Sequence, residues 1–179
     1  MGIVLIIIVI VVIIAIFRGK PKVGQIHAGQ NHYFDKLQFS SDEFYTLLEK
    51  IIEERQMPNT KISRKDYYEG SILSNKREYL RVKRFEDIFD ICAAPFGTGF
   101  FVSYWFAEPK HTFIDMLKRI PVLGPMVEGW HESSTYYKED TASMFRACTK
   151  DSITEAIGQI TTSQGVRGFS ELERMAFNK

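Results

Sequence analysis

The sequence predicts an α+β domain behind a single N-terminal transmembrane helix. An unbroken apolar run opens the chain, helical apolar patterns lie toward both ends of the remainder, and short apolar or alternating segments lie between them. Sequential strands joined by short turns pair antiparallel. We therefore expect a two-layer domain with an antiparallel sheet of about four strands, with helices from both ends of the chain covering one face.

Composition limits the class of protein. The 179 residues suffice for one ordinary domain and an anchor, and 45% apolar with 25% charged residues is typical of a folded globular chain. The formal net charge of +1 excludes attraction of the whole chain to nucleic acid or to acidic partners. The two cysteines, Cys92 and Cys148, are too few and too distant for a disulfide-stapled domain, so we interpret both as ordinary buried thiols.

Residues 1–18 are predicted to be a membrane anchor, marked by Ile3, Ile10, Phe17 and Arg18. Fifteen consecutive apolar residues run from Ile3 to Phe17, and twelve of them are Ile or Val. Such a segment favours a strand in water, but a lone segment in a bilayer must pair its own backbone and so becomes a helix. The helix would span roughly 23–26 Å, which is short for a bilayer, and Arg18 is expected to reach toward the headgroups.

Charge around the anchor predicts its orientation. Arg18, Lys20 and Lys22 follow the apolar run directly, and neither Lys nor Arg precedes it. A secretory signal would need basic residues before the run, so we interpret the segment as uncleaved. The positive-inside rule then places the N-terminus outside and the C-terminal domain in the cytoplasm, as a single-pass membrane protein.

Residues 19–39 are interpreted as a juxtamembrane linker, because Gly and Pro punctuate them and no period of 2 or 3.6 is visible. A helix is expected to follow Ser40, which stands three residues before Glu43 as in a capping box. Its apolar stripe consists of Phe44, Leu47, Leu48, Ile51 and Ile52. A single α+β domain is thus predicted over 40–179.

Four segments are predicted as strands, namely 61–68, 79–85, 88–94 and 100–107. The last two are the most apolar and should lie at the centre of the sheet. A turn is expected at 95–99, where Pro and two Gly residues occur.

Two interpretations remain open for residues 110–132. The segment fits a short helix and loop beneath the sheet, and it equally fits a hairpin lying on the membrane. The possible membrane-contacting residues are Lys118, Arg119, Val122, Leu123 and Trp130. A long helix is predicted over 138–162, with a further turn or two over 169–175.

The chemistry-bearing residues form no familiar site. No histidine pairs with another His or a Cys at ligand spacing, so neither a metal nor another cofactor is expected. The pair Gly97 and Gly99 is interpreted as a hairpin turn, because a strand rather than a helix follows it and a phosphate loop needs the helix. Cys92 lies in an apolar strand, where burial makes a thiol inert.

Two carboxylates on one predicted strand argue against acid–base chemistry. Asp87 and Asp90 are three residues apart and should point to opposite faces. If Asp90 points inward it needs a partner such as Arg81 or Arg84, which indicates a structural role. No residue is therefore predicted to be catalytic.

One local cluster stands out, with eight basic and three acidic residues between Lys61 and Arg84 and a net charge of +5. Three interpretations are open: a solvated sheet face, a surface for anionic lipid of the inner leaflet, or a nucleic-acid surface. The last is disfavoured because no nucleic-acid motif occurs. The candidate lipid or partner surface consists of Lys76, Arg77, Arg81, Lys83 and Arg84.

These observations predict a membrane-anchored, non-enzymatic interaction module, which could dock on the inner leaflet. Its expected partners are membrane lipid and either a protein partner or a second copy of the chain. The first alternative is a lipid- or small-molecule-binding domain, with the aromatic strands 88–94 and 100–107 as a pocket wall. The second alternative is an enzyme of unrecognised type.

Overall fold

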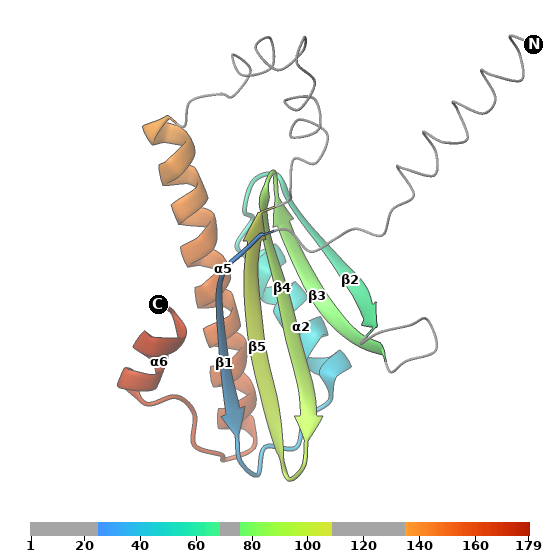
Figure 1. Ribbon diagram of the computed structural model, residues 1–179. Helices are drawn as coiled ribbons and strands as arrows, with labels where there is room; N and C mark the ends of the chain where they lie inside the picture. Colours follow the sequence, from blue (N-terminus) through green and yellow to red (C-terminus); the bar gives the residue numbers. More distant parts are fainter. Residues whose placement is uncertain (1–24, 69–75, 109–134) are drawn as a thin grey trace, which may run out of the picture.

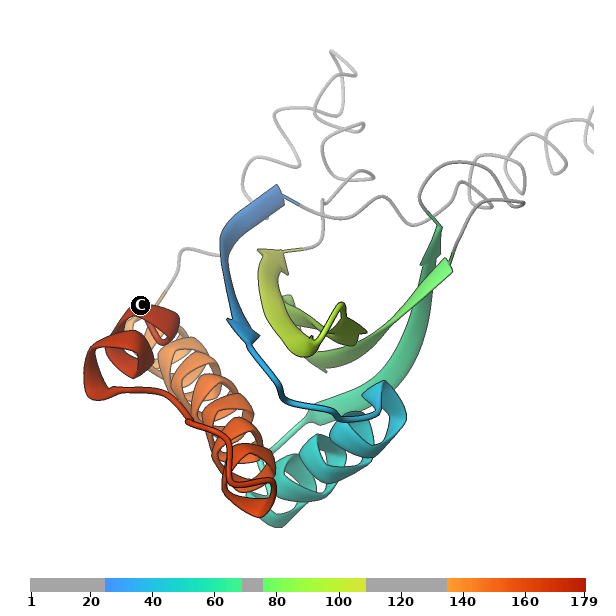
Figure 2. The same cartoon turned by 90° about the horizontal axis from the view of Figure 1, so that it is seen from below.

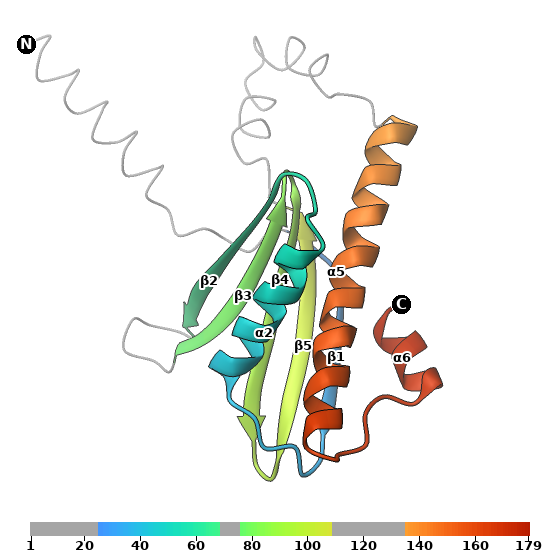
Figure 3. The same ribbon diagram turned by 180° about the vertical axis from the view of Figure 1, so that it is seen from behind.

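The computed structural model describes residues 25–68, 76–108 and 135–179. They form an α+β domain in which three helices pack on a five-stranded antiparallel sheet (Figures 1 and 3). The elements are β1 (Gln25–Phe34), α2 (Ser41–Glu54), β2 (Thr60–Tyr68), β3 (Lys76–Arg84), β4 (Asp87–Phe96), β5 (Gly99–Glu108), α5 (Tyr136–Ser163) and α6 (Glu171–Phe177).

The strand order is β1-β5-β4-β3-β2. The predicted interior position of the two most apolar strands is confirmed, because β4 is central and β5 lies between β4 and β1. The strand from the start of the domain thus pairs with the last strand, and Gln25 lies opposite Glu108. We call the end of the sheet that carries this pair the entry end, and the end that carries the β4–β5 turn the far end.

The number of strands and the extent of the linker need correction. Strand β1 occupies Gln25–Phe34, inside the range 19–39 that was predicted to be a linker, so the sheet has five strands and the fold begins before residue 40. The pairing of β1 with β5 shifts register between Ile26 and Ala28. The bulge interrupts the period of 2 near the start of the strand, and its regular part carries polar residues on both faces, such as Gln30 and Asn31, so the sequence shows no apolar alternation there.

Helix α2 begins where expected, but its cap differs. Ser40 is the N-cap residue, yet its side chain makes no capping hydrogen bond. The helix buries the predicted stripe except Leu47, which is only partly buried. It also buries Tyr45, whose hydroxyl donates to the Glu78 carbonyl at 2.9 Å and accepts from the Ala93 N–H at 2.9 Å. Burial raises the pKa of Tyr45 far above its ordinary value. This buried tyrosine therefore links α2 to β3 and β4.

Helix α5 confirms the long helix predicted over 138–162 and packs beside α2. Phe145 meets Phe89 of β4 with ring centroids 5.9 Å apart, and Arg146 reaches Asp87 at 3.0 Å at the entry end of the sheet. Helix α6 carries a complete capping box between Ser170 and Glu173, and its last residue lies against the ring of Tyr104. The three helices together cover one face of the sheet.

The sheet is curved and twisted when viewed along its strands, and the face without helices lies on the inner side of the curve (Figure 2). The core lies between the opposite face and the helices, where Phe89, Ile91, Phe100, Val102 and Tyr104 are all buried. Within the described ranges, no helix or strand packs on the inner face.

Candidate functional site on the uncovered face of the sheet

The open face is the side of the sheet that the helices leave uncovered. Because side chains alternate along a strand, it receives the odd-numbered residues of β2, β3 and β5, the even-numbered residues of β4, and the odd-numbered residues of β1 from Gly29 onward. Its chemistry is divided: β1 and β5 contribute aromatic and no charged side chains, whereas β2 and β3 contribute Lys and Arg side chains together with Tyr67 and Tyr79.

A buried ion pair lies at the centre of the charged part. The Arg81 guanidinium donates from Nε and Nη2 to the two Asp90 carboxylate oxygens, each at 2.7 Å. The Tyr67 hydroxyl donates to the same carboxylate at 3.0 Å and also contacts the guanidinium. Asp90 is 6% exposed, so this carboxylate is almost fully enclosed by its partners.

The cluster has the properties of a structural ion pair. The hydrogen bond from Arg81 to Asp90 raises the pKa of the Arg81 guanidinium. Burial, followed by the charge of Asp90, raises the pKa of the Tyr67 hydroxyl to about 12. Both groups therefore keep their protons at neutral pH. The prediction that Asp90 pairs with a neighbouring arginine is confirmed, and Asp87 points to the opposite face, toward Arg146. With both oxygens engaged, Asp90 is poorly placed to exchange a proton with a substrate.

Cys92 lies beside this cluster on the open face and is 1% exposed. Burial raises the pKa of its thiol, and the nearby Arg77 and Tyr79 lower it by less. A protonated, enclosed thiol is a poor nucleophile, which agrees with the interpretation from the sequence. Cys148 is also a free thiol, but the expectation that it is buried needs correction, because it is partly exposed on α5.

The aromatic part of the open face depends on two glycines. A Cβ on Gly29 would overlap the indole of Trp105 and lie 2.6 Å from its Cζ3, so the ring lies directly over the β1 backbone. A Cβ on Gly99 would lie 2.6 Å from the Tyr33 hydroxyl oxygen. Both aromatic rings remain substantially exposed on their other side. They present a stable apolar surface next to the charged part.

The five basic residues of the predicted lipid or partner surface do not share one face. Arg84 is buried on the helix side, where its Nε donates to the Pro58 carbonyl at 3.1 Å. Lys76 pairs with Asp66 at 3.1 Å, and Arg81 is neutralised by Asp90. Only Arg77 and Lys83 remain on the open face without a carboxylate partner among the described residues.

A second lysine joins Lys83 on the open face. Lys61 of β2 lies directly opposite it in the β2–β3 register, and both side chains are exposed. Like charges opposite each other on one face of a sheet destabilise the pair. No ion pair links either lysine to another residue of the described ranges. The pair is therefore a local concentration of unneutralised positive charge.

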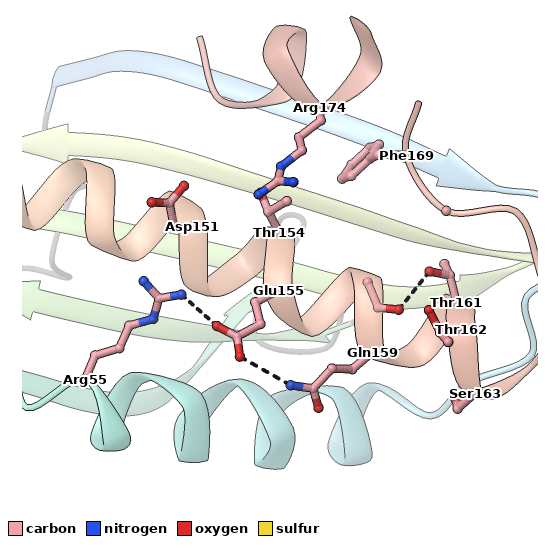
Figure 4. A pocket seen from close by; sticks show the side chains of 12 residues that line it. Arg55, Asp151, Thr154, Glu155, Gln159, Thr161, Thr162, Ser163, Phe169 and Arg174 are labelled. Carbon is pink, nitrogen blue, oxygen red and sulfur yellow. Dashed lines mark hydrogen bonds and ion pairs between the residues drawn. The ribbon is translucent and has the colours of Figure 1, made fainter. Parts of the chain in front are cut away.

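A groove open to solvent runs along the outer side of α5 (Figure 4). Arg55 crosses it to Glu155 at 2.7 Å, and Gln159 donates to the same carboxylate at 3.4 Å. Arg174 and Phe169 border its other side. The lining contains two carboxylates, Glu155 and Asp151, and neither histidine nor cysteine.

The remaining predictions concern metal ligands and the residues that were assigned to the membrane. Among the described residues, no group of three or more His, Cys, Asp and Glu side chains could hold a metal ion. His32 packs against Phe34 and Phe169, and burial lowers its pKa. The residues that lie outside the described ranges are Ile3, Ile10, Phe17, Arg18, Lys118, Arg119, Val122, Leu123 and Trp130.

A search of the described helices for a membrane span finds none that is long and apolar enough. Comparisons with protein-family models, with curated proteins and with solved structures give no match.

The length of the turn between β3 and β4 is a signal in the sequence that identifies the arginine partner of Asp90. A two-residue turn, Phe85 and Glu86, sets Arg84 opposite Asp87, and counting back along both strands sets Arg81 opposite Asp90. The same count places Arg84 on the other face. The role of Trp105 had no comparable local signal, because its contact with Gly29 joins β5 to a strand that was not predicted.

Proposed function

We propose that this chain is a membrane-anchored, non-enzymatic interaction module whose open face is the contact surface for a partner protein or a second copy of the chain. The observation that carries the proposal is the open face itself: a sheet surface that no described element covers, with exposed Trp105 and Tyr33 on β5 and β1 and the unneutralised Lys61 and Lys83 across the sheet on β2 and β3. Exposed aromatic anchors with polar groups around them are typical of protein contact surfaces.

The arrangement of polar groups supports binding over catalysis. Asp90 is held by Arg81 and Tyr67, and Cys92 is enclosed and protonated. The alternative of an aromatic-walled ligand pocket receives less support, because Phe89, Phe100 and the other aromatic residues on the helix side of β4 and β5 are packed in the core.

The anchor and its orientation are tested on the full chain in cells. We expect the chain to stay in the membrane fraction after alkaline carbonate extraction. A Gly24→Cys variant should resist a membrane-impermeant thiol reagent in intact cells and react after lysis. Extraction by carbonate would contradict the anchor, and labelling of intact cells would contradict the cytoplasmic orientation.

The contact surface is tested by site-specific photo-crosslinking. A photoreactive residue at Lys65, which is exposed on the open face, is compared with one at Lys50, which is exposed on α2. We expect a discrete adduct from position 65 and none from position 50. The adduct's mass distinguishes a second copy of the chain from another protein. Adducts from position 50 alone, or none from either position, would refute the proposal.

A further inference from the structure

We propose that the entry end of the domain is a lipid-contacting surface, in which Phe85, Tyr136 and Tyr137 enter the headgroup region and Lys61 and Lys83 face anionic lipid. This inference rests on the anchor of the proposed function, and its surface shares only Lys61 and Lys83, at the entry end of the open face, with the open-face contact. It identifies the lipid as anionic phospholipid of the membrane that holds the anchor.

The path of the chain brings the entry end close to the bilayer. Strand β1 begins there at Gln25, and only six residues lie between Gln25 and Arg18 at the end of the predicted anchor. The seven residue-to-residue steps span at most about 25 Å in any conformation. Strand β5 also ends at this same end, at Glu108, the partner of Gln25. The far end lies about 30 Å further along the strands.

Phe85 is an unusual residue for the position that it occupies. It forms the two-residue β3–β4 turn at the entry end, and its side chain is 65% exposed. Its φ of 49° lies in the left-handed region, which disfavours bulky side chains. The Arg84 guanidinium lies 5.0 Å from the ring centroid and leaves most of the ring in solvent. An exposed phenylalanine held at a strained turn is poorly explained by folding and well explained by an apolar environment outside the domain.

Helix α5 supplies two more aromatic side chains at the same end. Arg146 is level with the end of the sheet, because it binds Asp87, so the ten preceding helical residues extend about 15 Å beyond that level (Figures 1 and 3). The first two of these, Tyr136 and Tyr137, are 92% and 82% exposed. Tyrosine is enriched at membrane–water interfaces, where its ring is apolar and its hydroxyl remains hydrated.

The charges near these side chains fit the headgroup layer rather than the hydrocarbon. Lys61 and Lys83 lie one row from the end of the sheet, where Lys83 is opposite Ile88. Their mutual repulsion would be relieved by lipid phosphate or carboxylate. Glu139 and Asp140 follow the two tyrosines and oppose deep insertion. We therefore place the N-terminal end of α5, at Tyr136 and Tyr137, which we call the α5 tip, at the level of the headgroups.

The test uses the full chain reconstituted in nanodiscs of phosphatidylcholine with or without phosphatidylserine. An environment-sensitive fluorophore is attached at Phe85→Cys or at Phe96→Cys in a Cys148→Ser background, where the remaining Cys92 is buried. Phe96 is the matched control, because it is 71% exposed and borders the hairpin turn at the far end. Quenching by nitroxide lipid and by iodide reports where each fluorophore lies.

We expect the fluorophore at position 85 to be quenched by nitroxide lipid and protected from iodide, and the fluorophore at position 96 to behave oppositely. If both positions are accessible to iodide in a chain that resists carbonate extraction, the inference is overturned and the anchor stands. If the chain is extracted by carbonate, the proposed function and this inference both fail. If iodide protection at position 85 appears only when a protein partner is added, the surface binds protein and the inference is wrong.

A second measurement tests the lysines. In nanodiscs with phosphatidylserine, Lys61→Gln and Lys83→Gln should each lower the ratio of lipid-contacting to free domain about fivefold. The control is Lys65→Gln, on the same strand and face but about 13 Å further from the entry end, and it should have a smaller effect. No difference among the three variants, or equal contact without phosphatidylserine, would refute the assignment of the lysines.

Discussion

At the scale of single residues, two features of the domain carry an energetic cost: a strained backbone conformation in a turn and an ion pair that is largely removed from solvent. One is the left-handed Phe85, and the other is the Arg81–Asp90 pair on the open face. Each has a measurable energetic consequence that does not depend on knowing the partner.

Replacing Phe85 with Asn should raise the free energy of unfolding by about 0.5–1 kcal/mol, because Asn tolerates a positive φ and the exposed ring contributes little to the core. Phe96→Asn is the control and should bring no gain, since Phe96 has an ordinary φ. Denaturant unfolding of the full chain in detergent micelles measures both. A loss of stability in Phe85→Asn would show that the aromatic ring stabilises the fold.

Removing one partner of the buried ion pair should be more harmful than removing both. Asp90→Asn leaves the Arg81 guanidinium without its counter-charge and should cost about 2 kcal/mol, whereas Arg81→Met with Asp90→Leu should be close to neutral. The exposed pair of Lys76 and Asp66 is the control, and Lys76→Ala should leave the free energy of unfolding nearly unchanged. Equal losses in the single and double variants of the buried pair would contradict this account.

At the scale of secondary structure, β1 is the element on which the aromatic part of the open face depends. Its bulge between Ile26 and Ala28 sets the register that places Gly29 under Trp105. The contact joins two strands that are far apart in sequence, so it reports directly on the docking of β1.

Gly29→Ala should destabilise the domain by about 1 kcal/mol, because the added methyl group displaces the Trp105 ring. The displaced indole should show red-shifted fluorescence. Gly158→Ala is the control, since nothing lies within 4 Å of an added Cβ there, and it should stabilise α5 by about 0.5–1 kcal/mol. Unchanged tryptophan emission in Gly29→Ala would show that the ring does not rest on β1.

At the scale of the whole molecule, three enclosed phenols predict how stability depends on pH. Burial raises the pKa of Tyr67 and of Tyr104 to about 12, and that of Tyr45 further. The folded state therefore holds these protons more tightly than the unfolded state does. Their contribution to stability is complete below about pH 10 and is lost as the pH rises toward 12.

We expect tyrosinate absorbance from these residues to appear together with the loss of circular dichroism on alkaline titration. A Tyr67→Phe variant should show a weaker dependence of stability on pH in this range. Full ionisation of all eight tyrosines while the fold persists would contradict the enclosure of these phenols.

Local patterns predicted most elements, and the failures have identifiable causes. The stripe from Phe44 to Ile52 predicted α2, and the apolar runs predicted β4 and β5 at the interior of the sheet. Strand β1 was missed because a bulge interrupts its start and the remainder carries polar residues on both faces, such as Gln30 and Asn31. Tyr45 was missed because its burial depends on backbone groups of Glu78 and Ala93, which no helical pattern indicates.

The candidate site was predictable only in part. The sequence indicated that Asp90 needs a partner, and the structure selected Arg81 over Arg84. The basic cluster was correctly located on β2 and β3, but composition does not reveal which side chains are neutralised or on which face each one lies.

The sequence by itself determined what depends on near neighbours along the chain: the α+β class, the positions of α2 and α5, and the pairing expected of a buried aspartate. Periodicity and short turns are local properties, so they are readable without coordinates. Tertiary structure alone decided what depends on distant residues: the fifth strand, the rings resting on Gly29 and Gly99, and the gathering of Phe85 and the α5 tip at the end where the chain enters the sheet. These depend on the pairing of β1 with β5, a contact between segments more than sixty residues apart that no local pattern encodes.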